Sequence, residues 1–357
     1  MTSPWTEYRA SRAGDAQARL RYLDRTVRLL FPDAGEARPH SLLPHPVLPR
    51  RLVPRRWWHP GRRIMVPSGE DTIETYLGEA LSAPVRVVLH VRPARRANRK
   101  PILEAHTPDG LAAFVKIGDT GRTRALVTNE ARALGLLADV PLKTVVPPVV
   151  LHHGTWRGLS VLALSPLPVR RGPVAADLVA EAVGEIGRLG RTHRDGPPGG
   201  LAGSGGRGPT GEGDPVGGNG PVGGGGPAFP NGPADGPDGF AWHGDFSPWN
   251  IARGPDRRLL VWDWERFATG VPLGFDAVHH FFQRALRRTD PATAARACVT
   301  RALRVLAPFG LTAAEARLTA ARYLIALADR HAADGHSPLG PPARWLGPAV
   351  DFEEALI

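Results

Sequence analysis

A long run of glycine and proline at residues 196–239 limits which parts of this chain can form a core. More than half of these residues are glycine or proline, and few of their side chains are apolar. Such a segment buries too little surface to offset its ordering entropy, so we predict a disordered insertion. Its many GxG patterns have no lysine or following helix, so none predicts a phosphate loop. The core must come from the residues on either side.

The apolar patterns before and after this insertion differ in period. Alternating patterns predict strands at 84–91, 101–107, 111–118, 145–154 and 158–167, with one helix at 129–138 between the third and the fourth. After Pro173 the pattern is mainly helical to the C-terminus, apart from a short strand pair near 250–264. Sheet first and helices second predict an α+β fold in two lobes, with an antiparallel sheet at 84–168 and a mainly helical lobe at 169–357.

Residues 1–83 precede this pattern and are predicted to form an N-terminal extension. It begins with an amphipathic helix at 15–31, whose apolar residues at helical spacing are Leu20, Leu23, Val27 and Leu30. A basic segment rich in Pro, Arg and Trp follows at 39–67 and is predicted to be extended. Its Trp57 and Trp58 cover a neighbouring apolar surface or grip a phosphate-rich partner. A second helix is predicted at 68–80 with Ser68 as its N-cap.

The charge and cysteine content narrow the class of protein. The net charge of +11 would suggest nucleic acid as a partner, but only three of the 45 basic residues are lysine, which indicates a compositional bias toward arginine. We therefore do not expect nucleic-acid binding. The single cysteine, Cys298, excludes an internal disulfide and fits a reducing cytoplasm. No signal peptide or membrane span is predicted, and the expected location is cytoplasmic.

The residues that suggest chemistry lie in AWHGDFSPWNIA at 241–252 and LLVWDWERF at 259–267. Phosphoryl transfer requires a carboxylate that orients and deprotonates the attacking hydroxyl, and oxygen ligands that hold Mg²⁺ on the nucleotide. A loop carrying Asp245 and Asn250 offers the base and one metal ligand. A strand that ends at Asp263 offers a second carboxylate for the same metal. The alternative is that both segments are unrelated loop turns, where Asp and Asn are common.

The pattern HGDxxxxN followed by a strand and DWE resembles the aminoglycoside phosphotransferase and choline kinase-like branch of the protein-kinase-like superfamily. The resemblance covers about Pro84 to Leu327 and implies a bilobal protein-kinase-like fold that uses ATP and Mg²⁺. It implies that Asp245 is the catalytic base and that His243 supports its loop. It also implies that Asn250 and Asp263 are the magnesium ligands.

Residues upstream supply a second test of the resemblance. Such a kinase needs a lysine on the third strand and a glutamate on the next helix. Lys116 in FVKIG and Glu130, 14 residues later, occupy these positions. The segment between the lobes is predicted at 163–167, where the backbone of Leu164 and Ser165 is placed to bind an adenine edge. Asp276 is assigned either a helix-capping role or a place near the substrate, and a metal shared by His279 and His280 is not expected.

One departure from the family concerns the loop at 92–100, which lacks the usual glycines and carries Arg95, Arg96 and Arg99. These arginines contact nucleotide phosphates or form a solvated basic hairpin.

We expect transfer of the ATP γ-phosphate to a hydroxyl of a small molecule, of the amino sugar, sugar or amino alcohol class. The alternative is an inactive, kinase-like nucleotide-binding protein. Protein substrates are not expected because DFG and APE motifs are missing. The sequence does not identify the acceptor or the oligomeric state.

Overall fold

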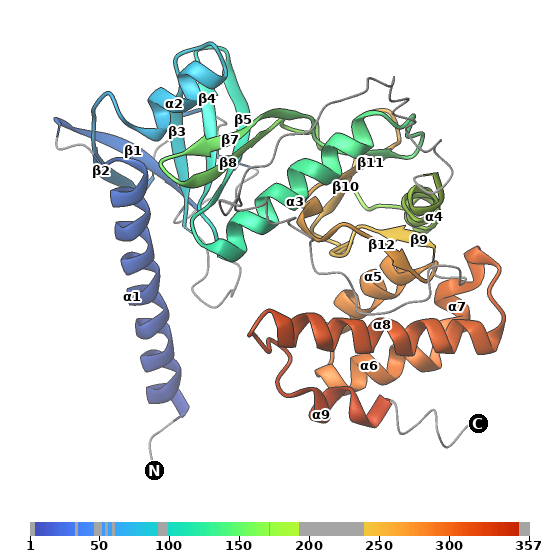
Figure 1. Ribbon diagram of the computed structural model, residues 1–357. Helices are drawn as coiled ribbons and strands as arrows, with labels where there is room; N and C mark the ends of the chain where they lie inside the picture. The colour runs from blue at the N-terminus through green and yellow to red at the C-terminus, as the bar shows by residue number, and fades with distance from the viewer. Residues whose placement is uncertain are drawn as a thin grey trace, which may run out of the picture.

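The computed structural model describes residues 4–32, 35–45, 52–53, 56–58, 61–91, 99–170, 172–192 and 239–349, which form two lobes (Figure 1). The strands are β1 (Ala37–Leu43), β2 (Arg63–Pro67), β3 (Arg86–His90), β4 (Ile102–Thr107), β5 (Gly110–Gly118), β6 (Val145–Val146), β7 (Val150–Trp156), β8 (Leu159–Leu164), β9 (Phe240–Trp242), β10 (Ile251–Arg253), β11 (Leu259–Val261) and β12 (Ala268–Val271). The helices are α1 (Pro4–Leu30), α2 (Ile73–Ala80), α3 (Gly121–Ala138), α4 (Ala176–Thr192), α5 (Phe275–Leu286), α6 (Pro291–Thr300), α7 (Ala302–Leu306), α8 (Ala313–Ala333) and α9 (Pro342–Trp345), with 3-10 turns η2 (Trp264–Arg266) and η3 (Ala307–Phe309). The predicted insertion lies outside the described residues except for Gly239.

The N-terminal lobe is built on a seven-stranded sheet with the order β2-β1-β3-β4-β5-β8-β7. Strands β3, β4 and β5 form an antiparallel meander in which Leu103 lies opposite both Leu89 and Val115. These side chains are almost fully buried because alternate residues of each strand face the core. The predicted antiparallel sheet with α3 after its third strand is confirmed. The parallel pairing of β1 with β3 was not predicted.

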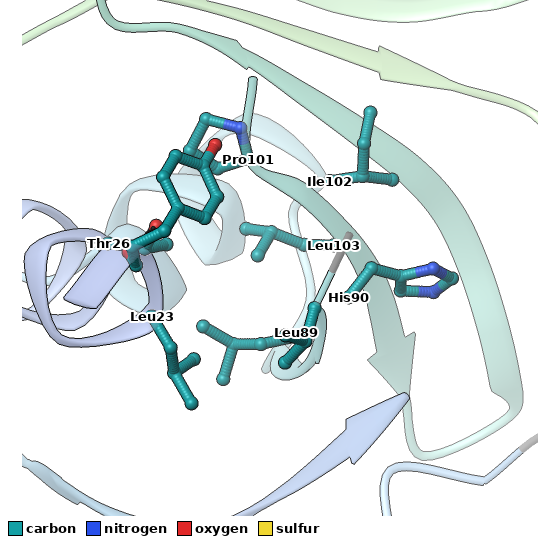
Figure 2. Close-up of a pocket in the computed structure, with 9 residues that line it drawn as sticks. Leu23, Thr26, Leu89, His90, Pro101, Ile102 and Leu103 are labelled. Carbon is teal, nitrogen blue, oxygen red and sulfur yellow. Dashed lines mark hydrogen bonds between the residues drawn. The ribbon is translucent and has the colours of Figure 1, made fainter. Parts of the chain in front are cut away.

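Residues 1–83 contribute directly to the core of this lobe, because β1 and β2 belong to the same sheet. The last turns of α1 also pack on it through Leu23, Leu30 and Phe31. Figure 2 shows Leu23 and Thr26 of α1 facing Leu89 and Leu103 around a pocket of about 10 Å³, which holds at most one water molecule. The placement of Leu20 on the apolar face was wrong, since this side chain is 65% exposed.

The second helix begins later than predicted. Its N-cap is Thr72, whose Oγ1 accepts a hydrogen bond from the Thr75 N–H at 3.3 Å. Ser68, the predicted cap, instead donates its hydroxyl to the Glu36 carbonyl at 2.7 Å. The helix therefore starts at Ile73, where an apolar residue packs into the sheet core.

The second lobe is mainly helical, as predicted. Helices α5, α6, α8 and α9 surround a core in which Phe282, Tyr323 and Trp345 are almost completely buried. A separate core joins the lobes, because Leu134 of α3 packs in the same cluster as Ile186 of α4. No described helix has the length and apolar content that a bilayer span requires.

Candidate active site

Lys116 forms ion pairs with one carboxylate of each lobe. It extends from β5, and its Nζ donates to Oε1 and Oε2 of Glu130 at 2.7 and 2.6 Å and to Oδ1 of Asp263 at 2.7 Å. Glu130 is fully buried on α3, and Asp263 follows β11 in the other lobe. Burial opposes the charge of Lys116, but the carboxylates of Asp263 and Glu130 outweigh it and raise its pKa. The structure thus brings together a lysine and two carboxylates that lie far apart in the sequence.

The loop that carries Asp245 is held by backbone contacts that the HGD sequence makes possible. Gly244 has a φ of +82°, and a Cβ on this residue would lie within 3 Å of the backbone of Arg266, so glycine is required. The Asp245 N–H donates to Nδ1 of His243 at 3.1 Å, and Nε2 of the same ring lies 3.2 Å from the Trp262 carbonyl. His243 therefore carries its proton on Nε2. Burial lowers its pKa to about 4, so the ring is neutral.

Asp245 is oriented by three side chains. The hydroxyl of Ser247 donates to Oδ1 at 2.5 Å, His279 Nε2 lies 3.1 Å from the same oxygen, and Asn250 Nδ2 donates to Oδ2 at 2.9 Å. Burial alone would raise the pKa of Asp245, but the hydrogen bonds from His279 and Ser247 lower it overall. The carboxylate is therefore ionised and able to accept a proton in a fixed direction.

The contacts that His279 and Asp276 make in this loop network were not predicted from the sequence. His279 on α5 reaches Asp245 with one nitrogen and the Tyr323 hydroxyl with the other, at 2.9 Å. Asp276, one turn earlier on the same helix, accepts the backbone N–H groups of His243 at 2.6 Å and Gly244 at 3.2 Å. The sequence signal was the spacing of Asp276 and His279 by three residues, which places both on one face of a helix.

Of the two residues predicted to hold a metal, Asp263 lies in a group of carboxylates and Asn250 is not part of that group. Carboxylate oxygens of Glu130, Asp263 and Glu265 all lie within 4.8 Å of one another. Asp263 has a φ of 73°, a left-handed conformation that is uncommon outside glycine and concentrates at functional sites. Asn250 is 4% exposed and uses its Nδ2 on Asp245, which leaves its Oδ1 as an acceptor. Glu265 is largely buried and paired with Lys100.

The two residues predicted to bind an adenine edge lie at the end of β8 and directly after it. Leu164 ends β8, and the Ser165 N–H donates to the Val149 carbonyl at 2.9 Å. That N–H is therefore already used, and the adenine-binding role of Leu164 and Ser165 stays a prediction. Arg95 and Arg96 lie outside the described residues. Arg99 stacks on the ring of Tyr22, with 3.6 Å between its Cζ and the ring centroid.

A cavity of about 260 Å³ opens beside Asp245 and Asp263. Its wall includes Arg99 and Lys100 from the first lobe and Arg266, Gln283, Arg330 and Asp334 from the second. The volume is close to the lower end of the range for small-molecule sites. Lys116 and Glu130 of the sheet lobe, the loop that carries Asp245, and Asp263 after β11 are arranged as in a bilobal, protein-kinase-like fold.

Comparisons with known proteins support only a general likeness. No protein-family model and no curated protein matches this sequence. Among solved structures, a "Putative fructosamine-3-kinase" from Haemophilus somnus 129PT is 14% identical, covers 80% of this chain and 96% of its own, and has a TM-score of 0.43. Monomeric WbdD is 17% identical over 60% of this chain and 45% of its own (TM-score 0.27), and the bifunctional kinase-methyltransferase WbdD is 13% identical over 63% and 42% (TM-score 0.29). Likenesses of this size do not identify a substrate.

Proposed function

We propose that this chain transfers the γ-phosphate of ATP to a hydroxyl of a small molecule and requires Mg²⁺. The observation that carries the proposal is the contact of Lys116 with Glu130 and Asp263, beside an Asp245 that is held by three hydrogen bonds. A structural ion pair alone would not require a second, separately oriented carboxylate at the same cleft. A phosphotransferase requires both.

Each residue is assigned a role by its chemistry. Asp245 accepts the proton of the acceptor hydroxyl, because it is an ionised carboxylate with a fixed orientation. Lys116, positioned by Glu130, binds nucleotide phosphates. His243 supports the base loop as a neutral ring, and Asp276 holds two backbone N–H groups of that loop. These groups orient the hydroxyl and the phosphate relative to each other, which is the main contribution of a protein to this reaction.

The residues near Asp263 fit a magnesium ion. Mg²⁺ prefers oxygen ligands and is commonly held by one or two carboxylates together with substrate phosphates. Asp263 offers a carboxylate and Asn250 an unused amide oxygen, so we assign these two residues as its ligands. When bound, the ion would neutralise developing charge on the phosphates. Glu265 lies in the same group of carboxylates.

The test distinguishes the proposed role of Asp245 as the base from that of Asp263 as a metal ligand. ADP release would be screened with ATP, Mg²⁺ and a panel of hydroxyl compounds, with the Asp245→Ala protein as the blank. Asp245→Asn should lower turnover by about 100-fold or more, because general-base catalysis typically contributes that much. Calorimetry should show ATP·Mg²⁺ affinity within a few-fold of the parent. Asp263→Ala should weaken both nucleotide binding and turnover, and Lys116→Ala should raise the KM for ATP.

Two outcomes would contradict the proposal. If Asp245→Asn abolished nucleotide binding while Asp263→Ala left binding and turnover intact, the assigned roles would be wrong. If the parent protein bound ATP·Mg²⁺ and phosphorylated no hydroxyl compound, an inactive nucleotide-binding protein would be the better description.

A further inference from the structure

Two arginines line the cavity beside Asp245, on the side formed by the helical lobe. Arg330 lies near the end of α8, and Arg266 ends η2. Neither is a freely solvated surface residue, since Arg330 is half-buried and the side chain of Arg266 is 14% exposed. Many arginines of this chain reflect its composition, but burying a guanidinium costs free energy unless something compensates it. These two positions therefore call for a physical explanation.

The protein itself compensates only part of this positive charge. Asp334 of the cavity wall forms ion pairs with both Arg266 and Arg122. Arg330 donates to the Gly244 carbonyl at 2.5 Å and lies 5.5 Å from the Trp242 ring centroid. It forms no ion pair with a carboxylate in the described ranges. Arg266 and Arg122 thus share Asp334, and Arg330 is left with a carbonyl and an aromatic ring as its partners.

Four further side chains on this side of the cavity carry no negative charge. His279, Gln283, His331 and His336 complete the wall. Burial lowers the pKa of His331 to about 4, so this ring adds no charge near neutral pH. Burial and the neighbouring Arg330 lower the pKa of Arg266 to about 10, as expected where two cations are crowded together. Of the other carboxylates of the cavity, Asp263 and Glu265 are paired with lysines, and Asp245 is held by Ser247, His279 and Asn250.

We propose that the acceptor is a hydroxyl compound that also carries a carboxylate or a phosphate, and that Arg266 and Arg330 bind this anionic group. The inference rests on the proposed phosphotransfer function. Arginine is well suited to the task, because its planar donors match carboxylate and phosphate oxygens. A cationic acceptor, such as an amino sugar or an amino alcohol, would be repelled by the guanidinium of Arg330, which pairs with no carboxylate of the described residues. The structure thus narrows the acceptor classes that the family resemblance implies.

The experiment compares acceptors that share a carbon skeleton and differ in charge. One set is D-glucuronate, D-glucose and D-glucosamine, and a second is glycerate, glycerol and 3-amino-1,2-propanediol. Within a set, kcat/KM for ADP release should be highest for the anion and lowest for the cation. A cation used as well as or better than the anion would overturn the inference. So would the absence of stimulation by both anions in a protein that binds ATP·Mg²⁺. A protein that binds no ATP·Mg²⁺ would contradict the proposed function instead.

Variants then test the two arginines. Arg330→Gln should lower the anion-to-neutral ratio of kcat/KM by about tenfold, since a hydrogen bond to a charged group contributes that order of free energy. Arg330→Lys, which keeps the charge, should retain most of the ratio. If Arg330→Gln did not fold, Arg266→Gln would give the same readout. An equal loss for all three members of a set would assign the arginines to the ATP phosphates and overturn the inference.

The opposite change provides a matched control. Asp334→Asn removes the carboxylate that pairs with Arg266 and keeps the side-chain shape. It should leave the anion-to-neutral ratio unchanged or raise it, and it should disfavour the cation further. A shift of preference toward the cation would contradict the charge argument.

Discussion

His279 orients the carboxylate of Asp245 through a hydrogen bond. Its Nε2 contacts an ionised carboxylate, so this nitrogen must carry the proton, and Nδ1 must accept the hydroxyl proton of Tyr323. The ring is 1% exposed, and burial lowers its pKa. His279 is therefore a neutral donor in a Tyr323–His279–Asp245 chain. Such a chain limits the rotation of the carboxylate and directs its remaining lone pairs toward the cavity.

We predict that His279→Ala lowers kcat by about tenfold, because Asp245 loses one of its orienting hydrogen bonds, while the KM for ATP stays within about twofold. Tyr323→Phe should cause a smaller decrease, since it acts only through the imidazole. The measurement is steady-state kinetics with saturating acceptor.

The control is a double-mutant cycle with Asp245→Asn. If His279 acts through Asp245, adding His279→Ala to Asp245→Asn should cost little further activity. Equal losses in both backgrounds would indicate a general structural role for His279.

At the scale of helices and strands, local pattern predicted the elements better than it predicted their partners. Alternation identified β3, β4 and β5, and the HGD and DWE motifs identified Asp245 and Asp263. The pairing of β1 with β3 joins residues more than 40 positions apart, and proline and arginine hide its alternation. The contact of His279 with Asp245 depends on how α5 is rotated against the base loop. Packing sets that rotation, and a single sequence does not reveal it.

The core role of α1 leads to a prediction about two leucines of the same helix. Leu30 is fully buried against the sheet, whereas Leu20 is 65% exposed. Leu30→Ala should therefore lower the free energy of unfolding by roughly 2–5 kcal/mol, the usual cost of a buried cavity. Leu20→Ala should change it by less than about 0.5 kcal/mol. Denaturant melts of both variants measure the difference, and equal effects would mean that α1 does not pack as described.

At the scale of the whole molecule, ion pairs cross between the lobes. Lys116 contacts Asp263, Lys100 contacts Glu265, and Arg122 of α3 contacts Asp334 after α8. The first two pairs lie where the nucleotide phosphates and the metal are proposed to bind. Ligands there would compete with these pairs, so nucleotide binding and the relative position of the lobes are expected to be coupled.

Buried histidines should make the stability of the molecule depend on pH. Burial lowers the pKa of His243, His280 and His331 to about 4, below the value of about 6.5 in an unfolded chain. Between pH 4 and 6.5 the unfolded chain binds more protons than the folded chain. The contribution of these histidines to the free energy of unfolding should therefore be fully present above pH 6.5 and decrease as the pH drops toward 4. Melting temperature measured across this range should therefore decrease with acid.

The variant His331→Gln isolates one of these contributions. It should give a flatter pH profile than the parent, because one buried, neutral histidine has been removed. An identical slope in both proteins would mean that His331 is not shielded from protons in the folded state.

The glycine- and proline-rich segment should be dispensable for both folding and activity. The ends of the connection lie together, because a Cβ added to Gly190 of α4 would lie 2.5 Å from the carbonyl oxygen of Gly239. Replacing residues 196–238 with a short Gly/Ser linker would therefore not strain α4 or β9, and shortening a loop removes closure entropy rather than contacts. The expected result is a melting temperature within a few degrees of the parent and unchanged ATP·Mg²⁺ affinity, measured by calorimetry. As a control, Gly190→Val should destabilise the protein, because its side chain would collide with this backbone. Loss of folding in the shortened protein, with α4 and β9 intact in sequence, would show that the segment supplies ordered contacts to the helical lobe.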